Sequence, residues 1–277
     1  MKDINDFIGK VIQGDCIEVM KTIPDNSVDL ILCDLPYGTT VCKWDVIIPF
    51  EKLWEQYKRI IKDNGAIILT ATNPFASLMV SSNLEMFKYE FIWNKHRPSN
   101  PMMAKHQPLR NHEQILVFYR NKPVYNPQPR KKNTGKMFSN RQEIKQKENP
   151  RSTETYGNTP LKFNDNSNEY GYPMTILNDI PMESNLNTKP EELGLHPTQK
   201  PISLGEYLIK TYTNEGMIVL DNTCGSGSFL VSAIRLNRKW IGIEISPEYC
   251  EIARKRLKPY LEQQTLAKKS EIERLKQ

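Results

Sequence analysis

The sequence has no apolar run long enough to cross a membrane. It contains 277 residues with 38% hydrophobic and 25% charged side chains, and none of its hydrophobic runs approaches the ~18 residues of a transmembrane helix. Its first ten residues, MKDINDFIGK, include acidic side chains and lack the apolar stretch of a signal peptide. We therefore expect a globular protein with a full core that stays in the cytoplasm and contacts no membrane.

Paired cysteines are also missing. The chain has five cysteines, an odd number, and they lie far apart with no C-x-x-C motif. This pattern predicts neither a disulfide nor a zinc site, and we expect no bound metal. Cys33 and Cys250 are interpreted as small core residues, which is the commoner place of a free cysteine. The five positions are Cys16, Cys33, Cys42, Cys224 and Cys250.

Negative charge is scarce in the middle of the chain. Between Lys88 and Arg151 there are fifteen Lys or Arg residues and four acidic residues, a net charge of +11, while the remainder carries −5. Clustered cations gain binding free energy by releasing counterions from phosphates, so this stretch indicates a polyanionic partner. Taken alone, the charge favours the simpler interpretation, a solvated lysine-rich loop.

Apolar runs and helical patterns alternate along most of the chain. Runs such as VDLILC and AIILTA are typical of buried strands, and segments such as FEKLWEQYKRIIK separate them. Strands that alternate with helices predict a mostly parallel, doubly wound α/β sheet. The expected strands are 10–13, 28–33, 66–71, 89–94, 114–119, 217–220 and 240–245. The expected helices are 50–62, 74–87, 201–213, 226–237 and 247–261, with a charged helix candidate at 266–277.

Residues 121–195 interrupt this alternation. They are rich in Asn, Pro, Ser, Thr and Lys and have few apolar runs. A loop of this length inside a compact domain is unusual, which favours an inserted functional region, either irregular or a small separate lobe. The sequence thus divides into one half of a core at 1–120, an insertion at 121–195 and a second half of the core at 196–277.

The stretch DLPYG follows the apolar run SVDLILC directly. Pro36 fixes its own φ and biases Leu35 toward an extended conformation, and Gly38 lets the backbone bend. These residues therefore leave the Asp34 carboxylate, the Leu35 carbonyl and the Tyr37 ring exposed together at the carboxyl end of a strand. We interpret this as one side of a functional site, although Pro36 and Gly38 could also make a plain bend.

A second strand end carries glycines. In MIVLDNTCGSGSFL a buried strand is followed by Asp221 and then by Gly225, Ser226 and Gly227, which open a helix. Glycines at such a turn let the backbone approach a ligand, and the first turn of a helix presents free N–H groups to it. The plain alternatives are that Asp221 caps the turn and that Ser226 starts the helix.

The spacing after this loop favours an adenosyl ligand. A dinucleotide-binding fingerprint needs a third glycine where this chain has Leu230, so a nicotinamide or flavin cofactor is disfavoured. Glu244 ends the next strand, 23 residues after Asp221, where a carboxylate can bind the two hydroxyls of a ribose. Ligands collect at the carboxyl ends of strands in open α/β sheets, and two strand-end motifs in one sheet can share one cleft.

Together these motifs resemble those of the amino-methylating DNA methyltransferases. DLPY is similar to the D/N/S-P-P-Y motif with Leu35 in place of the first proline, and TCGSG is similar to F-x-G-x-G with Thr223 in place of the phenylalanine. HPTQKP, at 196–201, stands between them. This order, catalytic motif, target-recognition region, HPTQKP and glycine motif, resembles the beta group and covers nearly the whole chain. It implies a Rossmann-like fold with a circularly permuted motif order and an inserted target-recognition region.

The resemblance implies S-adenosylmethionine as cofactor and a role for each matched residue. Those implied in catalysis are Asp34, Leu35, Pro36 and Tyr37. Those implied in cofactor binding are Asp15, Asp34, Thr198, Gln199, Lys200, Asp221, Thr223, Cys224, Gly225, Ser226, Gly227 and Glu244. From the sequence alone, Asp15 fits a helix cap before CIEVMK as well as a contact with the cofactor's adenine.

The implied reaction methylates an exocyclic amino group. If Asp34 and the Leu35 carbonyl accept the two amino hydrogens, the nitrogen lone pair can attack the sulfonium methyl in line, while Tyr37 stacks on the flipped base. The resemblance associates D-x-P-Y with adenine N6, so adenine is expected. The alternatives are a cytosine-N4 or an RNA methyltransferase and a non-catalytic DNA-binding relative. A nucleotide-dependent oxidoreductase is the weakest alternative.

Double-stranded DNA is the implied partner, and the basic stretch is its expected docking surface. A homodimer and a cognate restriction endonuclease are further partners that the resemblance raises. The candidate phosphate or base contacts are Lys95, Arg97, Lys105, Arg110, Arg130, Lys131 and Lys132.

Overall fold

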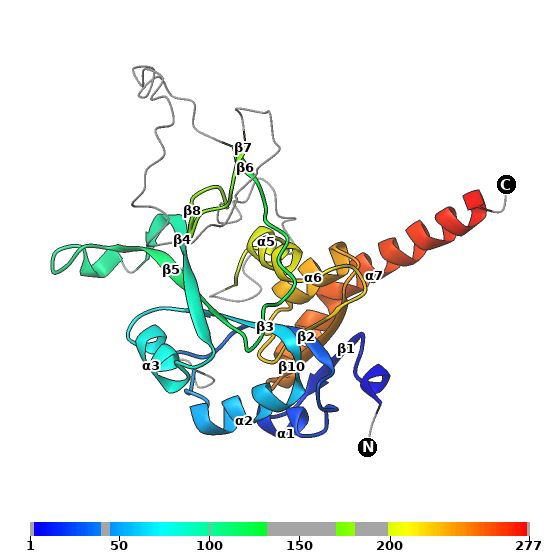
Figure 1. Ribbon diagram of the computed structural model, residues 1–277, viewed down its shortest axis with the longest axis horizontal. Coiled ribbons are helices and arrows are strands. Elements are labelled where there is room, and N and C mark those ends of the chain that lie inside the picture. The colour runs from blue at the N-terminus through cyan, green and yellow to red at the C-terminus, as the bar shows by residue number, and fades with distance from the viewer. Residues whose placement is uncertain (1–2, 40–44, 100, 132–169, 181–198, 276–277) are drawn as a thin grey trace, which may run out of the picture. The chain divides into compact units, whose positions relative to one another are not determined.

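The computed structural model describes residues 3–39, 45–99, 101–131, 170–180 and 199–275 (Figure 1). The chain divides into two compact units. The first comprises Met1–Asn126 and Met174–Gln277, and the second is Pro127–Pro173. In the second unit the described strands β6 (Arg130–Lys131) and β7 (Tyr170–Gly171) pair antiparallel. The boundaries expected near 120 and 195 stay predictions.

The described part of the first unit contains an eight-stranded sheet in the order β1-β10-β9-β2-β3-β5-β4-β8. Neighbouring strands from β1 to β3 are parallel, β5 runs antiparallel to β3 and β4, and β8 is parallel to β4. The sheet is therefore mostly parallel, as predicted. The strands are β1 Lys10–Gln13, β2 Val28–Asp34, β3 Ile61–Ala71, β4 Phe87–Ser99, β5 Arg110–Phe118, β8 Ile176–Leu177, β9 Ile218–Asp221 and β10 Lys239–Glu244.

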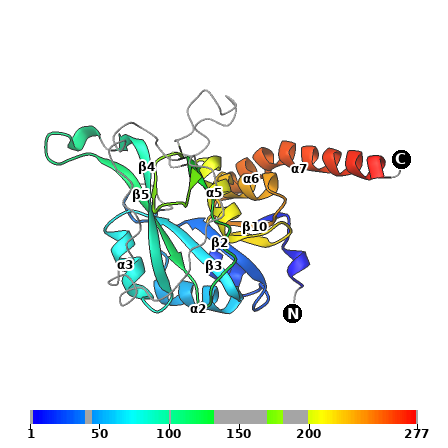
Figure 2. The ribbon, with the colours of Figure 1, turned by 45° about the horizontal axis from the view of Figure 1, so that its top comes forward.

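Helices cover both faces of this sheet (Figure 2). Successive strand side chains point to opposite faces, so in β2 Ile31 and Cys33 enter one core and Leu30 and Leu32 the other. Helices α1 (Cys16–Met20), α2 (Phe50–Ile60) and α3 (Phe75–Ser82) pack in the first core. Helices α5 (Ile202–Tyr212), α6 (Ser228–Arg235) and α7 (Pro247–Leu275) pack in the second. This confirms the doubly wound α/β class.

Several expected boundaries were wrong. The helix expected at 50–62 ends at Ile60, because Ile61 is already extended and pairs with Val28 of β2. The helix expected at 74–87 ends at Ser82. The helix expected at 247–261 and the charged tail form one helix, α7, with Pro259 inside it. Two short 3-10 helices complete the described elements, η1 (Ile4–Asp6) and η2 (Pro101–Met103).

The cysteine predictions can be checked at four of the five positions. Cys33 and Cys250 lie in the core, as expected, and Cys16 and Cys224 are also buried free thiols. Cys42 lies outside the described residues. Within the described ranges, no helix is long and apolar enough to cross a membrane. No group of His, Cys, Asp and Glu there has the arrangement of a metal site.

Candidate active site

A cavity of about 750 Å³ opens at the carboxyl ends of β1, β2, β9 and β10. Strands β2 and β9 are neighbours, but the chain leaves β2 through α2 toward β3 and leaves β9 through α6 toward β10 on the other side. The two strands therefore flank a topological switch point, where the loops diverge and leave a crevice. We call this cavity the strand-end cleft.

Most of the residues predicted for catalysis and cofactor binding line this cleft. Gly227 does not line it but is the N-cap residue of α6, and Thr198 lies outside the described residues. The predicted residues that line the cleft are Asp15, Asp34, Leu35, Pro36, Tyr37, Gln199, Lys200, Asp221, Thr223, Cys224, Gly225, Ser226 and Glu244. The cleft thus joins DLPY, the glycine loop and the end of HPTQKP, which are far apart in the sequence.

Asp34 is the last residue of β2 and is held from several directions. Its Oδ1 accepts hydrogen bonds from the Tyr37 hydroxyl at 2.5 Å and from the hydroxyl of Thr70, the residue beside it in β3. Its Oδ2 accepts a hydrogen bond from Lys200 Nζ at 2.7 Å. The Thr223 hydroxyl donates to the Asp34 main-chain carbonyl at 3.0 Å. These contacts therefore hold the carboxylate in one orientation in the cleft.

Tyr37 orients this carboxylate as a protonated phenol. Burial, followed by the charge of Asp34, raises the pKa of Tyr37 well above its usual value, so its hydroxyl remains a donor. Its ring packs against Phe75 at a centroid distance of 5.0 Å.

The turn after Tyr37 is held by Asp45, whose carboxylate accepts hydrogen bonds from the N–H groups of Gly38 and Thr39 at 2.8 Å.

Lys200 belongs to a cluster of charges that the sequence did not reveal. Its Nζ lies 3.3 Å from Glu113 Oε2, and Glu113 Oε1 accepts a hydrogen bond from Lys95 Nζ at 3.0 Å. Burial lowers the pKa of Lys200, but the Asp34 and Glu113 carboxylates outweigh burial and raise it. Burial raises the pKa of Glu113, but Lys200 and Lys95 outweigh burial and lower it. Lys200 and Glu113 are therefore both charged at neutral pH.

This cluster corrects the expectation for Lys95. The sequence predicts that Lys95 contacts DNA, but the residue is only 8% exposed and is paired with Glu113. An ammonium in that position is not available to a phosphate. Of the other candidates, Lys105 and Arg110 are exposed on the β4–β5 hairpin and Lys131 is exposed in the second unit, which also holds the partly buried Arg130. The Arg97 side chain and Lys132 lie outside the described residues.

Asp15 caps α1, which is one of the two readings that the sequence left open. Its Oδ1 accepts hydrogen bonds from the N–H groups of Ile17 at 2.8 Å and Glu18 at 3.2 Å. The residue also lines the strand-end cleft. A capping role therefore does not remove it from the site.

The glycine loop and Glu244 are joined by hydrogen bonds. Gly225 N–H donates to Glu244 Oε2 at 2.9 Å, and Ser246 N–H donates to Oε1 at 2.8 Å. Gly227 has a φ of 80°, a left-handed conformation that glycine adopts without strain. At the start of the loop Asp221 is buried, and burial raises the pKa of its carboxyl well above its usual value.

Four residues near these groups were missed by the sequence analysis: Thr70, Glu113, Asp45 and Asn222. Asn222 Oδ1 accepts a hydrogen bond from Tyr57 at 2.7 Å, and its buried Nδ2 has no partner within the described ranges. Asn222 stands inside a quoted motif, Thr70 lies on β3 with no motif around it, and Glu113 lies on β5 directly after Asn111 and His112, which resemble a family region near the target base. The proximity of Thr70 and Glu113 to Asp34 and Lys200 depends on strand pairing, which spacing along the chain does not encode.

The fold and the cleft are those of an α/β enzyme: the cleft lies at the strand ends, where such folds bind nucleoside-type ligands, and the Asp34 carboxylate lines it. The family model described as DNA methylase, for N6 and N4 methyltransferases, matches residues 28–255. The chain belongs to this family and is a DNA methyltransferase. The resemblance that the motifs indicate is thereby confirmed, and S-adenosylmethionine is the methyl donor of this family.

Two curated relatives align over most of the chain. DNA adenine methyltransferase YhdJ of Escherichia coli is 30% identical, and the alignment covers 89% of this chain and 82% of YhdJ. Type II methyltransferase M.HinfI of Haemophilus influenzae is 27% identical, covering 93% of this chain and 70% of M.HinfI.

Two solved structures have a similar fold. The M1.HpyAVI–SAM complex superposes with a TM-score of 0.58 and 22% identity, covering 90% of this chain and 98% of that one. The cytosine-N4-specific PvuII DNA methyltransferase superposes with a TM-score of 0.60 and 14% identity, covering 89% of each chain. At these identities the likeness establishes the fold alone.

Proposed function

We propose that this methyltransferase transfers the methyl group of S-adenosylmethionine to N6 of adenine in double-stranded DNA. The observation that carries the proposal is the Asp34 carboxylate, held in the strand-end cleft by Tyr37, Thr70 and Lys200. The D-x-P-Y form of the motif and the name of the relative YhdJ support adenine. Cytosine N4 is the second candidate, because either base presents an equivalent amino group and the PvuII enzyme shares the fold.

The residues around the glycine loop fit the cofactor. The 750 Å³ cleft is in the size range of small-molecule sites. Each oxygen of Glu244 accepts one backbone N–H and retains a lone pair for a ribose hydroxyl. The buried Asn222 Nδ2 is a donor without a partner among the described residues. Glu244, Gly225 and Asn222 would therefore hold the adenosyl part, and S-adenosylmethionine supplies an electrophilic methyl carbon when bound.

The residues of DLPY prepare the amino group as a nucleophile. Asp34 and the Leu35 carbonyl accept its two hydrogens, which localises the nitrogen lone pair for attack on the methyl carbon. The new N–C bond forms as the C–S bond breaks, and the electron pair of that bond stays on sulfur. Asp34 takes the proton that the amino group loses. The Tyr37 ring stacks on the flipped base, while its hydroxyl keeps Asp34 oriented.

The proposal is tested with purified protein, S-adenosylmethionine and unmethylated duplex DNA, with products identified as nucleosides by mass spectrometry. The wild type should form N6-methyladenine. Asp34→Ala should lower the rate roughly a thousandfold or more, because the acceptor of the amino hydrogens is lost. Cofactor binding should remain, since Glu244 and the glycine loop are unchanged.

The matched control is Asp63→Ala, which removes an exposed carboxylate near the start of β3 and should leave the rate unchanged. If N4-methylcytosine is the product, the proposed mechanism stands but the target base is cytosine rather than adenine. Full activity of Asp34→Ala would exclude Asp34 from catalysis. The homodimer and the cognate endonuclease stay predictions.

A further inference from the structure

The Lys200 ammonium lies between two carboxylates in the strand-end cleft. Its Nζ is 2.7 Å from Asp34 Oδ2 and 3.3 Å from Glu113 Oε2. The other oxygen of Glu113 binds Lys95, so two cations and two anions form one electrically balanced cluster. Lys200 and Lys95 are almost completely buried, at 7% and 8% exposure. In such a setting each ammonium needs a carboxylate partner at every stage of a reaction.

The two contacts of Lys200 are unequal. Its contact with Asp34 is a hydrogen bond, whereas the buried Glu113 Oε2 accepts no hydrogen bond from any residue that the structure describes. A shift of the ammonium by about 0.5 Å would bring the second contact to a usual hydrogen-bond length. Lysine has a flexible four-carbon stem and three donors, so it can make that shift without backbone movement.

The proposed reaction conflicts with the position of Lys200. An amino group that donates to Asp34 competes with whatever already occupies the carboxylate, and a charge-assisted hydrogen bond from an ammonium is stronger than one from a neutral amine. Oδ1 is already shared by Tyr37 and Thr70. Oδ2 accepts only the hydrogen bond from Lys200 and keeps a second lone pair, but the ammonium draws on its negative charge. Oδ2 therefore becomes a stronger acceptor for the amino group, and a better base for its proton, when Lys200 leaves it.

From this geometry we infer that Lys200 is a placeholder for the amino group of the target base: it holds Asp34 in the free enzyme and moves to Glu113 when the base enters. The inference rests on the proposed function, in which Asp34 receives that amino group. The move keeps every ammonium paired and leaves Asp34 with its negative charge directed at the base. Glu113 is then a positioning residue that acts through Lys200.

Three variants test whether Lys200 moves from Asp34 to Glu113. The measurement is the single-turnover methylation rate at saturating S-adenosylmethionine, on duplex DNA containing the sites that the wild type methylates. Glu113→Gln should lower this rate about tenfold or more, because Lys200 loses its second carboxylate and stays on Asp34. Combining Glu113→Gln with Lys200→Met should recover part of that loss, because the placeholder is gone. Lys200→Met alone is the remaining single variant of this double-mutant cycle.

The recovery distinguishes positioning from simple support of the fold. If Glu113 only stabilised the cleft, removing Lys200 as well would not restore the rate, and the double variant would be as slow as Glu113→Gln or slower. The comparison is made with Glu113→Gln itself, because the losses of residues in contact need not add. Lys95→Met is the matched control, since it removes a buried charge from the same cluster but leaves Glu113 to receive Lys200, and it should lower the rate less than Glu113→Gln. The cofactor affinity of Glu113→Gln should remain close to that of the wild type, whereas its thermal unfolding temperature should fall, because the buried Lys95 loses its carboxylate.

The outcomes separate this inference from the proposed function. A double variant as slow as Glu113→Gln, or slower, would overturn the placeholder and leave the methyltransferase reaction intact. N4-methylcytosine from the wild type would change the base only, and the same comparison of variants would still decide the role of Lys200. A wild type that forms no product on DNA would overturn the proposed function and the placeholder with it.

Discussion

At the scale of single residues, the departures from the family motifs have a structural explanation. Thr223 stands where the resembling motif has phenylalanine, and its hydroxyl donates to the Asp34 carbonyl. This bond links the glycine loop after β9 to the DLPY loop after β2. Leu35 stands where the motif has proline, and it is buried in the core and also lines the cleft. Both substitutions therefore keep the strand ends together.

Asp221 should make the free energy of unfolding depend on pH. Burial raises the pKa of its carboxyl in the folded protein well above the usual value of about 4, despite a hydrogen bond from Thr223 N–H that lowers it in part. The folded state then binds this proton more tightly than the unfolded chain does. The contribution of Asp221 to stability is full below about pH 4 and is lost as pH rises through the folded pKa.

Asp221→Asn should remove this dependence while keeping the shape of the side chain. We expect the variant to be more stable than the wild type at pH 8, and the difference to be larger at pH 8 than at pH 5. Urea unfolding of both proteins without cofactor, at the two pH values, measures this. A difference that is the same at pH 5 and pH 8 would show that Asp221 does not titrate between them.

At the scale of secondary-structure elements, the packing of α5 on α6 depends on one glycine. A Cβ atom at Gly205 would lie 2.4 Å from Ser232 Oγ and 2.9 Å from a ring carbon of Phe229. Ser232 cannot turn away cheaply, because its hydroxyl hydrogen-bonds with the carbonyls of Ile202 and Ser228. The two helices therefore approach closely only because position 205 has no side chain.

Gly205→Ala should consequently destabilise the protein. The overlap should cost about 1–3 kcal/mol, which outweighs a gain in helix propensity of up to about 1 kcal/mol. Urea unfolding gives the loss directly. Ser232→Ala is the control, and the double variant should lose less than the sum of the two single losses, because the clash with Oγ is relieved. Additive losses would mean that the helices separate rather than clash.

The elements themselves were largely predictable, but their ends were not. Strong apolar periodicity located β1, β2, β9 and β10 to within one or two residues. The ends of α2 and α3 were wrong because Ile61 and Asn83 continue favourable local patterns, and only strand pairing or tertiary packing ends those helices. β8 has two residues, too few for a periodicity, and was not found.

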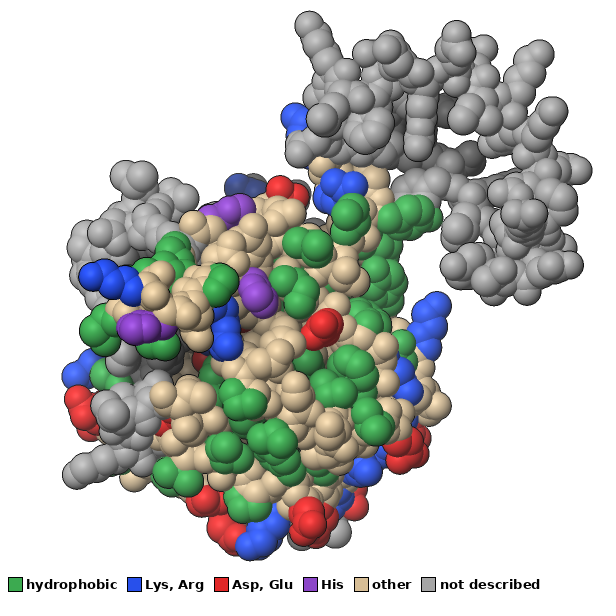
Figure 3. All heavy atoms as spheres, turned by 90° about the vertical axis from the view of Figure 1, so that its left-hand side faces the viewer, with side chains coloured by type: hydrophobic (Ala, Val, Ile, Leu, Met, Phe, Trp, Pro, Cys, Tyr) green, Lys and Arg blue, Asp and Glu red, His purple; other side chains and the backbone are tan. Residues whose placement is uncertain are grey.

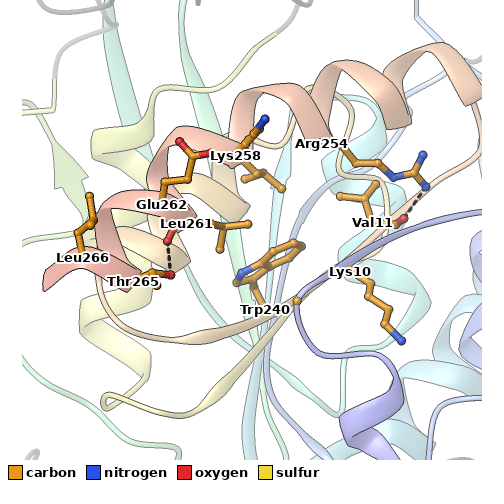
Figure 4. Close-up of a pocket in the computed structure, with 11 residues that line it drawn as sticks. Lys10, Val11, Trp240, Arg254, Lys258, Leu261, Glu262, Thr265 and Leu266 are labelled. Carbon is orange, nitrogen blue, oxygen red and sulfur yellow. Dashed lines mark hydrogen bonds between the residues drawn. The ribbon is translucent and has the colours of Figure 1, made fainter. Parts of the chain in front are cut away.

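The length of α7 was missed for a similar reason. Its first half contributes Ala253 and Leu257 to the core, whereas its last turns are rich in charged residues and look like a separate element in the sequence. Arg254 ties the helix to the sheet by donating to the Val11 carbonyl of the edge strand β1 at 2.8 Å (Figure 4). A second cavity lined by both elements lies at the amino ends of β1 and β10, away from the strand-end cleft.

At the scale of the whole molecule, the net positive charge lies in a different part of the chain from the catalytic carboxylate. The cluster of Asp34, Lys200, Glu113 and Lys95 is balanced and largely buried, so it contributes little to long-range attraction of DNA. The net charge of +11 between residues 88 and 151 includes Lys105 and Arg110, both exposed on the β4–β5 hairpin, which projects beyond the sheet in Figure 2. Figure 3 shows Lys, Arg and His side chains scattered among apolar ones on the face that it draws.

DNA affinity should therefore fall steeply with salt. Each phosphate contact contributes about 0.9 to the slope of log affinity against log salt concentration, so the double variant Lys105→Gln, Arg110→Gln should reduce that slope by about 2. Fluorescence anisotropy of a labelled duplex at several salt concentrations measures the slope. The control variant, Lys239→Gln with Lys255→Gln, removes two exposed lysines outside the basic stretch and should leave the slope unchanged. Equal slopes for both double variants would mean that the β4–β5 hairpin does not contact the phosphate backbone.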